Sequence, residues 1–210
     1  MIDLAVLPAY LVTVLVITLA PGPDNAYIAA IAVARGSRAG VLSALGMAVG
    51  MALHVTAATL GLALLLRTIP VALTGVRLAG AIYLGWLAVS TLRSARDSAT
   101  TAPLAPPDRQ ILGRALLTNL TNPKIILFFA AFLPQFTRTG YGPISVQLLT
   151  LGMVFLLIGL VWDSIVGLFA ARLGTRLARG TRAATRLSVV AGLTFGVLAL
   201  ALLADVLFAS

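Results

Sequence analysis

The chain has 210 residues, of which 60% are hydrophobic and 10% charged, and its mean hydropathy is +1.06. This composition excludes an ordinary soluble domain, whose apolar fraction is closer to half. It predicts one all-α polytopic membrane domain over residues 1–210. The net charge of +9 comes from arginines in short loops, which indicates membrane topology and not nucleic-acid binding. Since the chain contains no cysteine, a disulfide framework and thiolate chemistry are also excluded.

Six apolar stretches predict six transmembrane helices. They cover residues 4–33, 39–66, 69–92, 111–134, 144–171 and 187–208. The polar linker 94–110 separates repeat one, residues 1–93, from repeat two, residues 111–210. With three spans in each half, the second half should cross the membrane in the opposite orientation, as in transporters built from inverted repeats. The N-terminus lacks the basic region of a signal peptide, so we expect the first helix to be retained.

The arginines collect in alternate loops. Eleven lie after the first, third and fifth spans, whereas two lie after the second and fourth. Because basic residues accumulate on the cytoplasmic side, this distribution predicts that both termini are extracytoplasmic. The basic cluster at 172–186 is expected to contact anionic membrane lipids.

The first span is interrupted by Pro21-Gly22-Pro23-Asp24-Asn25. Proline removes a backbone donor and clashes with the preceding turn, so the helix should break there. Such a break is tolerated in a membrane only where it is buried in protein or lines a polar cavity. The other interpretation is a turn at the membrane surface, which would leave residues 26–34 as a short separate helix.

The second interruption, Asn122-Pro123-Lys124, lies inside the fourth span, with Asn119 one turn earlier. Neither half of this span is long enough to cross the bilayer alone, so the break should lie within the membrane. Lys124 is the only lysine of the chain, and an unpaired charge at this depth costs about 3 kcal/mol or more. The other interpretation of Lys124 is a side chain that extends to the interface.

Two broken helices at matching positions of two halves are typical of a transporter binding site. The free helix ends suit a zwitterion, because amides face its carboxylate and carbonyls face its ammonium group. Asp24 and Lys124 add full charges and are expected to pair when no substrate is bound. The predicted substrate-binding residues are Pro21, Gly22, Pro23, Asp24, Asn25, Asn119, Asn122, Pro123 and Lys124.

Three residues are candidates for proton coupling: Asp24, Asp163 and His54. Asp163 is an acid within the fifth span, beside Trp162, and its other interpretation is a carboxylate hydrogen-bonded to a neighbouring helix. His54 is the only histidine of the chain, and a histidine can change its charge near neutral pH. A single histidine in a helix is, however, more often a packing or hydrogen-bonding residue.

Glycines mark the faces on which helices should pack closely. Gly46 and Gly50 form a GxxxG pattern in the second span, and Gly80 and Gly85 lie in the third. The pattern permits packing within the bundle as well as a homodimer.

These residues resemble the LysE/RhtB family of bacterial amino-acid exporters, the homoserine, threonine and lysine efflux type, over nearly the whole chain. The resemblance rests on the two interruptions and on the motifs Arg35-Gly36, Gly80–Gly85, Phe128-Phe129 and Phe132–Phe136. It implies six helices and efflux of small amino acids or derivatives driven by the proton motive force. We expect a protein of the bacterial inner membrane with no enzymatic activity and no cofactor. The resemblance also implies functional roles for Asp24, Asn122, Pro123 and Lys124, whereas Asp163 lies outside the family pattern.

Three alternatives to amino-acid export remain open at this point. One is a structural or assembly subunit, which would not need two charged helix breaks. A metal-ion exporter would have few ligands available, because the chain has one histidine, six aspartates, no glutamate and no cysteine. An intramembrane enzyme would need a nucleophile or a second acid at a recognisable spacing, and His54 has none.

Overall fold

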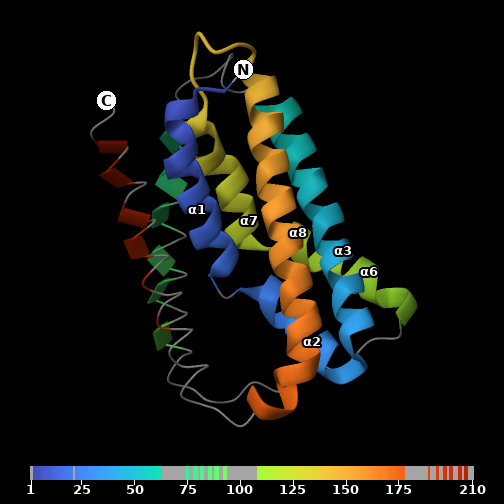
Figure 1. Ribbon diagram of the computed structural model, residues 1–210. Helices are drawn as coiled ribbons and strands as arrows, with labels where there is room; N and C mark the ends of the chain where they lie inside the picture. The colour runs from blue at the N-terminus through green and yellow to red at the C-terminus, as the bar shows by residue number, and fades with distance from the viewer. Residues whose placement is uncertain are drawn as a thin grey trace.

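The computed structural model describes residues 2–20, 22–62 and 108–177 without gaps, and short pieces between residues 74 and 93 and between 189 and 207. All regular elements of these residues are helices, and the long ones run side by side (Figure 1). The expected all-α class is therefore confirmed. The predicted spans 69–92 and 187–208 lie largely outside the described residues, as does Pro21.

The first span is broken, as predicted. A short 3-10 turn, η1 (Leu4–Val6), leads into α1 (Leu7–Leu19), which is followed by α2 (Pro23–Arg35). The two helices are bent by 49° at the break. Pro23 begins α2, where its fixed φ suits the first helical position. Gly36 ends the helix with φ 86°, a conformation that glycine adopts without steric cost.

The fourth span is broken in the same way. α6 (Asp108–Leu120) and α7 (Pro123–Leu127) are separated at Asn122, and α7 continues through the π-helix η3 (Phe128–Phe132) and the 3-10 helix η4 (Leu133–Phe136). The bend is 47°. The side chain of Asn122 starts α7, because its Oδ1 accepts the backbone N–H of Lys124 at 3.1 Å.

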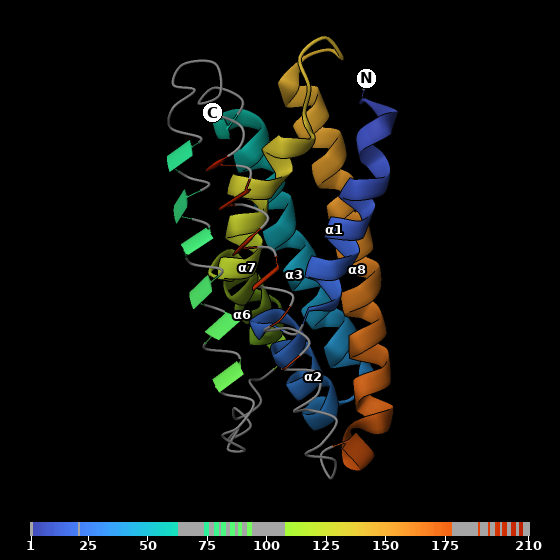
Figure 2. The same ribbon diagram turned by 90° about the vertical axis from the view of Figure 1, so that its left-hand side faces the viewer.

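Two unbroken helices complete the described bundle. They are α3 (Ser37–Ala57), which continues in the π-helix η2 (Ala58–Leu62), and α8 (Ile144–Leu177). Their apolar parts, of 25 and 29 residues, are long enough to cross a membrane, and the described residues hold up to four spans if each bent pair is one. α1 and α7 share one half of the bundle and α2 and α6 the other, so the two broken pairs run in opposite directions (Figures 1 and 2). The complete six-helix inverted repeat stays a prediction.

The glycine face of α3 packs inside the bundle. A Cβ atom on Gly46 would lie 2.5 Å from the carbonyl oxygen of Leu112, and one on Gly50 would lie 2.6 Å from Oδ1 of Asn119. These distances leave no room for a side chain, so α3 and α6 contact each other through backbone. The GxxxG face is therefore not available to a second protomer. Gly80 lies outside the described residues, and a homodimer stays a prediction.

The two ends of the bundle differ in charge. Arg35 and Arg38 flank the α2–α3 corner, and Ser37 Oγ in that corner donates to the carbonyl oxygen of Leu168 at 3.3 Å. The corner therefore lies beside the last part of α8, which carries Arg172. At the opposite end, Arg138 forms an ion pair with Asp3 at 3.3 Å. The arginines predicted to share one side of the membrane thus share one end of the described bundle.

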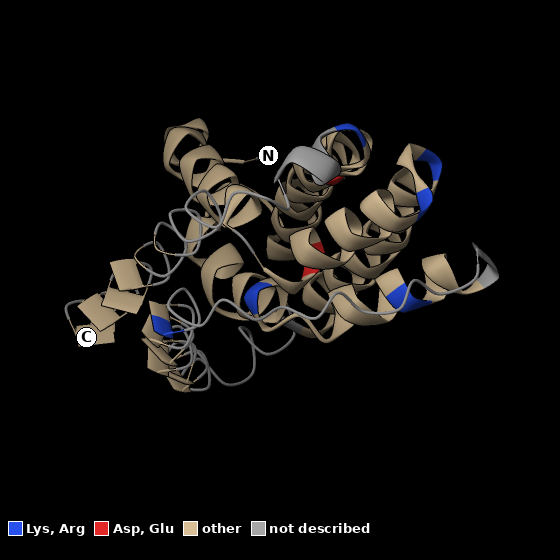
Figure 3. Ribbon diagram, turned by 90° about the horizontal axis from the view of Figure 1, so that it is seen from below, with Lys and Arg blue, Asp and Glu red and all other residues tan. Residues whose placement is uncertain are grey.

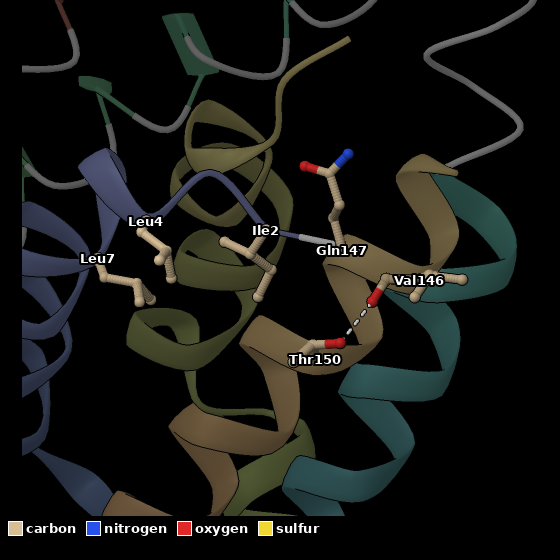
Figure 4. A pocket seen from close by; sticks show the side chains of 6 residues that line it. All are labelled: Ile2, Leu4, Leu7, Val146, Gln147 and Thr150. Carbon is tan, nitrogen blue, oxygen red and sulfur yellow. Dashed lines mark hydrogen bonds between the residues drawn. The ribbon is translucent and has the colours of Figure 1, made fainter. Parts of the chain in front are cut away.

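A pocket of 380 Å³ lies at the end that carries Asp3 (Figure 4). The N-terminal segment lines it with Ile2, Leu4 and Leu7, and α8 lines it with Val146, Gln147 and Thr150. The side chain of Gln147 turns away toward the preceding loop, where it bonds the backbone of Arg138 in both directions, at 3.0 and 2.9 Å. The pocket is apolar and lies apart from the two helix breaks.

Candidate functional site

The two helix breaks meet through an ion pair in the interior of the bundle. Nζ of Lys124, at the start of α7, lies 2.9 Å from Oδ2 and 3.1 Å from Oδ1 of Asp24, in the first turn of α2. The two side chains are 2% and 6% exposed. The predicted pairing of these residues is therefore confirmed, and Lys124 does not extend to an interface. Viewed along the helices, the ribbon segments that carry acidic residues lie toward the middle of the bundle (Figure 3).

Side chains satisfy the free carbonyl groups at the end of α1. A helix leaves its last four carbonyls without partners, and lipid cannot supply them. The carbonyl oxygen of Ala20 accepts from Lys124 Nζ at 3.0 Å and from Asn25 Nδ2 at 3.1 Å. A turn at the membrane surface would use water for this purpose. At the first break, side chains from both halves of the chain instead donate these hydrogen bonds.

Asn25 also connects the first break to α8. Its Oδ1 accepts from the indole Nε1 of Trp162 at 3.2 Å. Gly22 brings the backbone against the ion pair, because a Cβ atom there would lie 2.7 Å from Asp24 Oδ1 and 3.1 Å from Lys124 Nζ. Residue 22 therefore has to be small for the two charges to meet at this place.

The second break contains polar groups that lack partners. Asn119 and Asn122 are fully buried, at 0% and 1% exposure. Neither side-chain atom of Asn119 bonds any described residue, nor does Nδ2 of Asn122. Leaving such a group unsatisfied costs about 1–3 kcal/mol. These amides are groups that a polar ligand would satisfy.

Asp163 adds a third ionisable group to the site. It is 2% exposed, and its Oδ2 has no hydrogen-bond partner in the described part of the chain. Its carboxyl group interacts electrostatically with both Asp24 and Lys124. The structure thus brings together three of the predicted residues from α2, α7 and α8.

His54 lies beside the second break, away from the ion pair. Its ring stacks on Phe129 with the centroids 5.6 Å apart, and its Nε2 lies 3.4 Å from the carbonyl oxygen of Asn119. None of its hydrogen bonds to described residues is to Asp24, Lys124 or Asp163. A role in positioning the end of α6 fits these contacts.

Four aromatic residues, Tyr10, Phe128, Phe129 and Phe155, pack together as an aromatic layer that begins one helical turn after Lys124. Phe128 follows Lys124 by one helical turn, and its ring stacks on Phe155 with a centroid distance of 4.2 Å. Phe129 meets Phe155 edge to face, and the hydroxyl group of Tyr10 donates to the carbonyl oxygen of Leu151. These aromatic residues are not among the predicted substrate-binding residues, although the spacing of four residues places Phe128 on the same helix face as Lys124.

Groups of three or more histidine, cysteine, aspartate or glutamate side chains that could hold a metal ion are absent from the described residues. The described residues of the site supply one cation, two carboxylates and neutral amides.

Comparisons with known proteins identify the family. Residues 15–206 match the model of the LysE type translocator family. A protein of Pseudomonas aeruginosa described as an uncharacterized membrane protein is 36% identical over 91% of this chain and 88% of its own length. The leucine efflux protein of Klebsiella pneumoniae is 38% identical over 74% of this chain and 71% of its own. That of an Enterobacter species is 34% identical over 80% of each chain. No solved structure matches significantly. The chain belongs to the LysE type translocator family.

Proposed function

We propose that this protein is a secondary active exporter of amino acids or close derivatives, and that the two helix breaks bind the substrate. The observation that carries the proposal is the buried Asp24–Lys124 ion pair at the point where the breaks meet. A zwitterion can replace each partner of this pair, because its carboxylate suits Lys124 and its ammonium group suits Asp24. The exchange keeps every buried charge paired, which a membrane interior demands.

Neutral apolar amino acids are the proposed substrate class. Two relatives are named leucine efflux proteins, and the aromatic layer begins one turn after Lys124. A substrate whose charged groups replace the Asp24–Lys124 contacts would have an apolar wall available for its side chain. A basic or acidic side chain would meet no matching charge in that layer.

The proposed transport cycle is proton antiport with alternating access in the bacterial inner membrane. The opposite directions of the two broken pairs support alternating access, because inverted halves can exchange inward-open and outward-open forms around one site. The concentration of described arginines at one end supports a cytoplasmic location for that end and extracytoplasmic termini.

Purified protein in proteoliposomes tests the proposal. Leucine, threonine, lysine and aspartate, each labelled, are offered under an imposed pH gradient to the wild type, Asp24→Asn and the control Asp3→Asn, a matched change at the end of the bundle. We expect gradient-driven flux of leucine in the wild type and the control and its loss in Asp24→Asn. If folded wild-type protein moves none of the four amino acids, the proposal is wrong.

A further inference from the structure

We propose that Asp163 carries the exchanged proton, and that the ammonium group of the substrate competes with this proton for the Asp163 carboxylate. The inference rests on the proposed function. It assigns proton exchange to the side chain of Asp163 on α8, whereas the two helix breaks are proposed to bind the substrate.

The charges of the site lead to this assignment. Lys124 is engaged by Asp24 through both carboxylate oxygens, which leaves Asp163 as the acid without a counter-charge among the described charges nearby. Burying an unpaired carboxylate costs several kcal/mol, whereas a carboxylic acid is neutral. In the substrate-free site, a proton on Asp163 therefore makes the set of three groups electrically neutral.

The other titratable side chains around α8 are engaged elsewhere. Tyr10 of α1 donates to the carbonyl oxygen of Leu151, and Tyr27 of α2 donates to that of Ile111 at 3.3 Å. His54 of α3 lies against the carbonyl oxygen of Asn119. The charged groups that act on Asp163 are Asp24 and Lys124. The proton is thus assigned to Asp163, which among the described residues is the one buried acid with an unpartnered oxygen, Oδ2.

Competition at one carboxylate gives antiport directly. When the substrate enters from the cytoplasm, its carboxylate binds Lys124, and its ammonium group lies between Asp24 and Asp163, where it takes the place of the proton. The proton leaves to cytoplasmic water. When the substrate leaves on the other side, a proton from outside returns to the same oxygen. No bond other than the O–H bond of Asp163 breaks or forms. Since a zwitterion carries no net charge, each cycle moves one positive charge inward.

Proton release by the wild-type protein is the first test. Leucine is added to purified protein in weakly buffered detergent solution, and both the bound leucine and the pH change are measured. We expect proton release on binding, and an apparent Kd that rises about tenfold for each unit of pH decrease in the acidic range. Binding of leucine without proton release would overturn the inference, whereas absence of binding would contradict the proposed function instead.

The second test compares Asp163→Asn with Asp163→Glu in proteoliposomes. Asp163→Asn should lose flux driven by a pH gradient and also the pH dependence of leucine binding, because an amide cannot carry the exchanged proton. Asp163→Glu keeps a carboxyl group and should retain gradient-driven flux. Gradient-driven flux in Asp163→Asn would overturn the inference, as would leucine binding by folded Asp163→Asn protein that keeps the pH dependence of the wild type. If Asp163→Asn does not fold, proton release by the wild type decides.

Discussion

Gly50 lies directly against the side chain of Asn119, so that α3 touches α6 at the level of the second helix break. A Cβ atom on residue 50 would be 2.6 Å from Oδ1 and 2.8 Å from Cβ of Asn119. We therefore expect Gly50→Ala to displace Asn119 and to lower the free energy of unfolding by about 1–3 kcal/mol, the usual cost of overpacking. Transport should fall together with the melting temperature, which is measured on purified protein.

Gly113→Ala is the matched control for this change. Apart from its chain neighbours and the backbone of its own helix, no atom of a described residue lies within 4 Å of a Cβ built on Gly113. Alanine has the higher helix propensity by about 1 kcal/mol, so the control should be as stable as the wild type or more stable. Equal melting temperatures for the two variants would contradict the close contact between α3 and α6.

The Asp24–Lys124 pair should contribute both to the stability of the protein and to transport. A double-mutant cycle separates these two contributions. Asp24→Asn and Lys124→Met each leave one buried charge without its partner, which costs about 3–5 kcal/mol. The double variant contains neither charge, so its melting temperature should recover toward that of the wild type. Its leucine transport should stay absent, because both substrate contacts are lost. A double variant as unstable as the single ones would argue against the direct pairing.

The two breaks and their ion pair were predictable because the residues that form them are rare in apolar spans. Pro123 and Lys124 interrupt an otherwise continuous helix, and an isolated charge at that depth needs a partner. Asp24, in a similar interruption, was the natural candidate. The sequence also predicted close packing at Gly46 and Gly50, but it left open whether the contact was within the chain.

The other partners at the site were not predictable for a physical reason. The carbonyl oxygen of Ala20 holds Lys124, but every residue carries a carbonyl group, so no sequence pattern marks this one. The bond from Trp162 to Asn25 depends on how α8 is rotated against α2. Periodicity gives little information on rotation in a helix that is apolar on most sides. The third helix of each predicted repeat falls largely on residues that the structure does not describe.

The bond between Trp162 and Asn25 predicts different effects for two conservative variants. Trp162→Phe removes the Nε1 donor, which typically costs about 0.5–1.5 kcal/mol, and keeps most of the packing. Asn25→Asp keeps the acceptor for Trp162 but removes the donor to the carbonyl of Ala20 and adds a carboxylate beside Asp24. We expect a modest fall in leucine transport for the first variant and a near-complete loss for the second. Equal effects would show that the contact with Ala20 contributes nothing of its own.

The absence of cysteine from the natural chain makes the predicted topology directly testable. Ala34→Cys lies near the end of α2, and Thr139→Cys lies in the loop before α8; both positions are exposed. A membrane-impermeant maleimide should label Thr139→Cys in intact cells, and Ala34→Cys only after permeabilisation, because arginines collect on the cytoplasmic side. The reverse pattern would invert the proposed orientation and place the termini in the cytoplasm.

The side chain of Gln147 is hydrogen-bonded to the backbone of the loop before α8, and replacing it should make that loop more accessible to a protease. Its side chain is 1% exposed, and it bonds the N–H and the carbonyl oxygen of Arg138 and the carbonyl oxygen of Gly142, the last at 3.1 Å. Gln147→Ala leaves these backbone groups unpaired, at a cost of about 1–3 kcal/mol. We therefore expect trypsin added to intact cells to cleave after Arg138 faster in this variant than in the wild type.

Thr150→Ala is the matched control, because Thr150 lines the same apolar pocket but bonds only within its own helix, to the carbonyl oxygen of Val146 at 2.8 Å (Figure 4). Its cleavage rate should equal that of the wild type. Leucine counterflow should persist in both variants, since the loop lies apart from the ion pair. Equal cleavage of Gln147→Ala and Thr150→Ala would mean that the Asp3–Arg138 ion pair, and not Gln147, holds the loop in place.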